Sequence, residues 1–217
     1  MNDRESQAAF MTALSTEHFV LQTAASATVS EAAARSSLYV LSLSSSLVAI
    51  GFASRSREAL VPFLATVLSS VFVLGLFTIV RLVDTALENM RCLIGIARIR
   101  GYYRTLTPEA AVYFAAQHGR WPEAHMEPSL RLGPLVAFFT TSASMIAFIN
   151  SIVGGVGVTL LAGELLAGEP TVLALLLGVA ATVALMAVFI AYQRWRFRIF
   201  ELAAPHEERE QTDHRRE

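Results

Sequence analysis

Residues 170–192, PTVLALLLGVAATVALMAVFIAY, form an uncharged apolar run of membrane-crossing length. A helix needs about 20 apolar residues to cross roughly 30 Å of hydrocarbon. Three further runs qualify, at residues 36–53, at 62–83 and within 135–162. None of them alternates polar and apolar residues, as the strands of a membrane barrel would. Because lipid offers the backbone no hydrogen bonds, the four runs are predicted to be helices. The sequence therefore predicts an all-α protein with four transmembrane helices.

The composition supports this prediction. The 217-residue chain is 54% apolar and only 16% charged, with a mean hydropathy of +0.50, whereas soluble domains carry about 25% charged residues. The four runs contain no Asp, Glu or His. Their single charge is Arg81, near the end of its run, where an arginine side chain can extend to the lipid headgroups. The charged residues are therefore concentrated outside the predicted spans.

Several function classes are disfavoured by the residues present. The net charge of −1 gives no bulk attraction to nucleic acid. All 17 basic residues are arginine, so no lysine of a phosphate-binding loop or Schiff base exists. The spacing of His118, Glu123, His125 and Glu127 matches no closed zinc site. We therefore expect no enzyme activity, no metal, no cofactor and no nucleic-acid partner.

The orientation prediction follows from the arginines. Segment 84–131 carries six arginines and 194–198 carries three, whereas 163–169 carries none and has two glutamates. The remaining connector, 54–61, is short and has two arginines. Because cytoplasmic flanks of membrane helices are enriched in Lys and Arg, both termini and segment 84–131 are predicted to be cytoplasmic. The predicted location is the inner (plasma) membrane, with several crossings.

The predicted organisation has five parts. They are a cytoplasmic N-terminal helix (1–35), a transmembrane hairpin (36–83), a cytoplasmic helical segment (84–131), a second transmembrane hairpin (132–192), and a basic anchor with a disordered tail (193–217).

The helical pattern of the second span continues without a break from residue 78 to residue 99. Thr107-Pro108-Glu109 then resembles a helix start, with a capping threonine and a proline in the first turn. Span two is thus predicted to extend into a cytoplasmic helical hairpin. Its apolar stripes must pack against either the N-terminal helix or a second subunit.

Hydroxyl and small residues are unusually frequent in the first and third spans. The candidate pore-lining or helix-packing residues are Ser42, Ser45, Ser46, Thr140, Ser144, Asn150 and Ser151. They could line a water-filled path through an oligomer, where polar groups replace part of an ion's hydration shell. They could equally allow close helix packing, which is the commoner role of such residues. Asn150 needs a partner in either case, because an unpaired amide in hydrocarbon costs several kcal/mol.

A second candidate site is basic. Arg91, Arg98, Arg100 and Arg104 follow span two, next to Tyr102 and Tyr103, close to the predicted inner leaflet. These arginines could bind anionic lipid headgroups or a phosphate-bearing ligand. The alternative is that they only set the orientation of the chain in the membrane.

Two stretches carry a family resemblance. Residues 17–37 (EHFVLQTAASATVSEAAARSS) and 81–114 (RLVDTALENMRCLIGIARIRGYYRTLTPEAAVYF) resemble a family of uncharacterised four-span membrane proteins of actinobacteria. That resemblance implies a bacterial source and no mechanism. From the residues themselves, the leading hypothesis is a homo-oligomeric channel or pore assembled or gated by cytoplasmic helices. The alternative is a non-conducting scaffold or effector that binds a cytoplasmic protein through residues 84–131.

Overall fold

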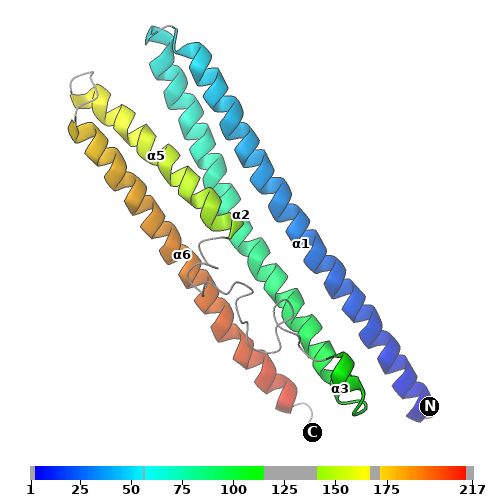
Figure 1. Ribbon diagram of the computed structural model, residues 1–217. Coiled ribbons are helices and arrows are strands. Elements are labelled where there is room, and N and C mark those ends of the chain that lie inside the picture. The colour runs from blue at the N-terminus through cyan, green and yellow to red at the C-terminus, as the bar shows by residue number, and fades with distance from the viewer. Residues whose placement is uncertain (1–2, 56, 115–140, 167–171, 214–217) are drawn as a thin grey trace. The chain divides into compact units, whose positions relative to one another are not determined.

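The chain folds into long helices. The structure is a computed structural model that describes residues 3–55, 57–114, 141–166 and 172–213. These residues form helices and turns, with no strand among them. The helices are α1 (Asp3–Ala53), α2 (Arg57–Arg104), α3 (Ala110–Tyr113), α5 (Ser142–Leu166) and α6 (Val172–Asp213) (Figure 1).

Four of these helices are long and apolar enough to cross a membrane. The qualifying stretches are Asp3–Ala53, Leu60–Arg104, Ser142–Leu165 and Val172–Phe200. The predicted all-α class with four membrane-crossing helices is therefore confirmed, and the chain is of the multi-pass membrane type.

The chain divides into two compact units. One, here called the extension unit, comprises Met1–Ala33 and Asp84–Thr140. The other, here called the span unit, comprises Ala34–Val83 and Thr141–Glu217. Each unit therefore takes one part of α1 and one part of α2, and the span unit also contains α5 and α6.

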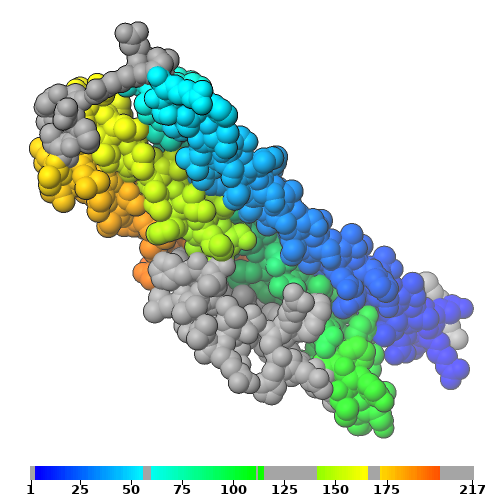
Figure 2. Space-filling view, turned by 45° about the horizontal axis from the view of Figure 1, so that its top comes forward, coloured from blue at the N-terminus to red at the C-terminus, as the bar shows by residue number. Residues whose placement is uncertain are grey.

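Helix α5 touches the three other helices of the span unit. Tyr39 of α1 and Phe72 of α2 both hydrogen-bond to its Asn150. On the third side α5 runs alongside α6, in the opposite direction (Figure 1). Figure 2 shows α5 lying directly against the second part of α1. The amide of Asn150 on α5 is therefore enclosed by other helices.

A pair of glycines brings α5 and α6 close together. An added Cβ on Gly155 would collide with the carbonyl oxygen of Gly178 and with Thr182. An added Cβ on Gly178 would collide with the carbonyl oxygen of Gly155 and with Thr159. Each threonine donates its hydroxyl to the glycine carbonyl one turn before it, at 3.1 Å for Thr159 and 3.0 Å for Thr182. Small residues thus let the two backbones approach, as is common between membrane helices.

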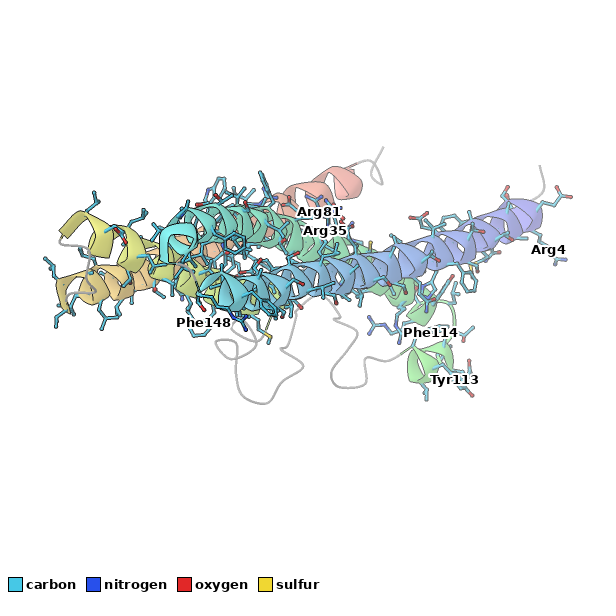
Figure 3. All side chains as sticks on the ribbon, turned by 90° about the horizontal axis from the view of Figure 1, so that it is seen from above. Arg4, Arg35, Arg81, Tyr113, Phe114 and Phe148 are labelled. Atoms are coloured by element: carbon cyan, nitrogen blue, oxygen red, sulfur yellow. The ribbon has the colours of Figure 1, made fainter. Side chains whose placement is uncertain are left out.

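The outside of the span unit is apolar. Large side chains such as Leu41, Phe77, Phe148 and Leu176 are more than half exposed, and Figure 3 shows Phe148 at the edge of the bundle, pointing outward. Such an extensive exposed apolar surface would be unusual for a protein in water. It is expected for a surface that contacts lipid tails. The exterior of the span unit is thus mostly apolar, and its interior is partly polar.

In the extension unit, α1 and α2 pair in antiparallel fashion. Thr28 Oγ1 donates a hydrogen bond to Asn89 Oδ1 at 3.2 Å. Further along, Leu21 lies over Gly95, where an added Cβ would be 2.8 Å from a Leu21 methyl group. Beyond that, the rings of Phe10 and Tyr102 meet edge to face at 5.5 Å. The N-terminal helix, the first of the two candidates from the sequence, therefore packs on the extension of α2.

The ends of the helices differ in detail from the sequence-based prediction. α2 continues to Arg104, beyond residue 99, where the helical pattern in the sequence ended. Thr107 lies three residues before α3, and its Oγ1 accepts a hydrogen bond from the backbone N–H of Ala110 at 3.2 Å. The N-cap residue of α3 is Glu109 and not the predicted Thr107, and the Glu109 side chain makes no capping hydrogen bond. α6 continues past Pro205 to Asp213, where the sequence predicted a disordered tail. The residues after Pro205 include Glu, Arg and Gln, which are good helix formers.

We expect Gly178→Ala to lower the melting temperature of the purified protein in detergent, whereas Gly51→Ala should leave it unchanged or raise it. A methyl group at Gly178 has no room, and overpacking costs about 1–3 kcal/mol. Gly51 has nothing within 4 Å of an added Cβ, so only the gain in helix propensity remains. Equal melting temperatures for the two variants would contradict the close approach of α5 and α6.

Candidate functional site

Asn150 is the centre of a buried polar cluster in the span unit. Its side chain is 2% exposed. Its Oδ1 accepts a hydrogen bond from the hydroxyl of Tyr39 at 3.1 Å, and its Nδ2 donates to the backbone carbonyl of Phe72 at 3.2 Å. Tyr39 is fully buried. One amide side chain therefore joins α1, α2 and α5.

Gly75 makes room for this amide. It lies on α2 less than one turn after Phe72. The three atoms nearest to an added Cβ at Gly75 are all atoms of the Asn150 amide. Any larger residue there would displace the amide from the Phe72 carbonyl. The cluster thus depends on Gly75 as much as on its hydrogen-bonding members.

A second polar contact joins α5 to α6. The hydroxyl of Ser144 donates to Oε1 of Gln193 at 3.2 Å, and the two side chains are 2% and 1% exposed. Thr141 caps the start of α5, because its Oγ1 accepts from the backbone N–H of Ser144 at 3.2 Å. The Thr141 hydroxyl also donates to the Ser144 hydroxyl at 2.9 Å. Ser151, also buried, donates to the carbonyl of Ala147 in its own helix.

The serines of the first span are placed differently. Ser42 and Ser46 are half-buried, and the Ser46 hydroxyl donates to the carbonyl of Ser42 at 2.7 Å. Ser45 is exposed on the outside of the span unit. Thr140 lies outside the described residues. The six of these hydroxyl and amide residues that the structure describes therefore do not form one continuous surface.

The four predicted arginines lie in the part of α2 that belongs to the extension unit. Arg91 and Arg98 are exposed and lie two turns apart on one face, whereas Arg100 and Arg104 are half-buried. The histidines and glutamates considered as metal ligands, residues 118–127, are outside the described residues. Within the described ranges, no group of three or more potential metal ligands comes together.

Three residues that form the buried polar contacts were not predicted from the sequence. Tyr39 and Gln193 are the partners of Asn150 and Ser144, and Gly75 shapes the cavity for the amide. The available signal was weak. Tyr39 is the one residue of the first span that combines a large ring with a polar group, and Gln193 directly follows the apolar run of the fourth span.

The chain matches no protein-family model, no curated protein and no solved structure. The chemistry of the site must therefore be argued from its residues. The buried groups are a phenol, two amides, hydroxyls and backbone carbonyls, and they satisfy one another. Such a set suits the joining of helices.

We expect Tyr39→Phe and Asn150→Leu to be coupled in a double-mutant cycle of unfolding free energy. Each change alone removes the shared hydrogen bond, and membrane hydrogen bonds average about 0.6 kcal/mol with a maximum near 1.7. The double variant should therefore lose less than the sum of the two single losses. Ser46→Ala, combined with Asn150→Leu, serves as the control pair. Its effect should be additive, because the Ser46 hydroxyl donates to a carbonyl of its own helix. Strict additivity in the first cycle would show that the bond contributes nothing.

Proposed function

We propose that this chain is a plasma-membrane scaffold that binds a cytoplasmic protein partner through its extension unit. The orientation rests on the arginine-rich segments 84–131 and 194–198, which the positive-inside rule assigns to the cytoplasm. The span unit then serves as the membrane anchor of the extension unit.

One observation carries the proposal: the extension unit exposes large apolar side chains. Tyr113 is 81% exposed and Val112 is 74% exposed, and both belong to the short helix α3. Figure 3 shows Tyr113 at the tip of this helix, pointing away from it. Phe19 on α1 is 67% exposed. Exposed aromatic residues outside lipid are typical of the anchors of protein–protein interfaces.

The buried cluster of α5 also favours a scaffold over a pore. Ser144 and Asn150 are hydrogen-bonded to other helices of the same unit, and Ser151 to its own helix. Opening these groups to an aqueous path would break those bonds. The cluster therefore supports a closed bundle.

An oligomeric pore remains the second candidate, because one hydroxyl face is left on the outside. Ser45 is exposed on α1, together with its neighbour Ser44 and with Ser37 two turns earlier. In an oligomer this face could meet its copies around a shared axis. The extension unit would then assemble or gate the pore.

The scaffold proposal predicts a discrete crosslinked partner. A photo-reactive amino acid placed at Val112 in cells should yield one protein adduct that Tyr113→Ser removes, because the aromatic anchor is lost. The same probe at Thr12, an exposed polar position of α1, is the matched control. An adduct pattern shared by the two positions, or adducts only to the chain itself, would contradict the proposal.

Liposome flux separates the two candidates. We expect the purified full chain to release no entrapped ions or small solutes over a range of pH and membrane potential. A pore through the serine face would instead give a release that Ser45→Leu abolishes and Ser46→Ala preserves. That second result would replace the scaffold by the pore.

A further inference from the structure

The span unit has an apolar groove on its outer surface, between α2, α5 and α6. The groove has a volume of about 560 Å³ and is walled by α2 and α6, with α5 as its floor. Leu64 and Leu68 stand on one wall, and Ala181 and Leu185 on the other. Its lining is apolar except for Ser69 and Glu164. A volume in the range of about 300–1,000 Å³ is typical of ligand pockets.

Glycines create the groove and define its deep end. Gly157 lies on the floor, and an added Cβ there would meet nothing within 4 Å. At Gly154 an added Cβ would instead meet Leu185 at 2.6 Å and Phe72 at 2.8 Å. The floor is therefore open at Gly157, and these two side chains close it over Gly154.

The dimensions of the groove fit a hydrocarbon chain. Its floor extends along α5 from Val153 to Glu164, which is about 16 Å at 1.5 Å per residue. Half of a bilayer core of roughly 30 Å is about 15 Å, so the groove is as long as one leaflet is thick. Spread over that length, the volume corresponds to a cross-section of roughly 35 Å². A helix about 10–12 Å wide needs at least twice that area.

The charge at the mouth of the groove indicates the headgroup. Glu164 lies within one turn of the end of α5, at the opposite end of the groove from Phe72, and is exposed. Residues 163–169 contain no basic residue, whereas Arg55 precedes the start of α2. Glu164 is the one charged side chain among the groove's described lining residues. A carboxylate at the headgroup level attracts a cation and repels an anionic lipid.

We propose that this groove holds an acyl chain of an amine-headed phospholipid, with the ammonium group at Glu164. An empty groove would leave its walls without contacts on one side, and a flexible chain restores them. The site is independent of the proposed scaffold function, because it lies entirely in the span unit.

The test is photo-crosslinking in vesicles. The full chain is reconstituted in phosphatidylethanolamine and phosphatidylglycerol, with a trace of phosphatidylethanolamine that carries a diazirine on one acyl chain. Adducts are mapped by mass spectrometry. A diazirine near the chain terminus should label Phe72 and Leu185, and one near the ester should label Leu161. Labelling there should exceed that of Leu41 and Val48, which are lipid-exposed positions of α1.

Two variants with one control sharpen the result. Gly157→Leu fills the floor and should reduce groove labelling roughly fivefold, the ratio that about 1 kcal/mol of lost interaction produces. Gly51→Leu, at another glycine with open space, should leave it unchanged. Glu164→Gln should reduce labelling by the amine-headed probe and raise labelling by a phosphatidylglycerol probe, because it removes both the attraction to the ammonium group and the repulsion of the anionic headgroup. Helix content and elution volume confirm that each variant folds.

Three outcomes would overturn the proposal. Uniform labelling around the span unit would show that the groove has no preference for lipid. Labelling of the groove below that of Leu41 and Val48 would show that another occupant, such as a helix of a second copy, fills it. Equal labelling by the amine-headed and phosphatidylglycerol probes in the wild-type protein would remove the role assigned to Glu164. The wild-type measurements decide these points even if a variant fails to fold.

Discussion

The span unit is organised around the need of one amide for hydrogen-bond partners inside an apolar bundle. Asn150 is 2% exposed, so water does not supply them. Its oxygen and nitrogen are satisfied by the Tyr39 hydroxyl and the Phe72 carbonyl, which belong to two other helices. Because an unpaired amide in hydrocarbon costs several kcal/mol, the position of α5 relative to α1 and α2 is fixed by chemistry as well as by packing.

Helix α5 is held to α6 by a close backbone approach and by a second hydrogen bond. Gly155 and Gly178 remove side chains where the two backbones meet, and Ser144 reaches Gln193 nearer to the start of α5. Association of helices in lipid lacks the hydrophobic driving force that operates in water, so close packing and hydrogen bonds must supply it. The close glycine contacts and the hydrogen-bonding side chains are both concentrated on α5. This explains why this span is so rich in small and polar residues. Where the floor of α5 is bare at Gly157, the bundle instead leaves a groove for lipid.

The extension unit is held together by the pairing of α1 with α2. Its pairing uses Leu21 over Gly95, an edge-to-face contact of Phe10 with Tyr102, and one hydrogen bond between Thr28 and Asn89. Among its described residues, the exposed large apolar side chains are spread along α1 and over α3 and the turn before it, and they are fewer than on the span unit. The exposed surfaces of the two units therefore differ in how many large apolar side chains they carry. The proposal of a protein partner therefore rests on the exposed residues of α3 and not on those of the spans.

The sequence by itself determined the all-α class, the four membrane-crossing helices and the continuation of α2 well past its span. These follow from local properties, namely the length of apolar runs and an unbroken helical period. It also singled out Ser144, Asn150 and Ser151, because polar residues in an apolar run are conspicuous. Only the tertiary structure decided what these residues contact. Hydrogen-bond partners and close approaches join positions up to 111 residues apart, such as Tyr39 and Asn150, and no periodicity along the chain encodes such a pairing.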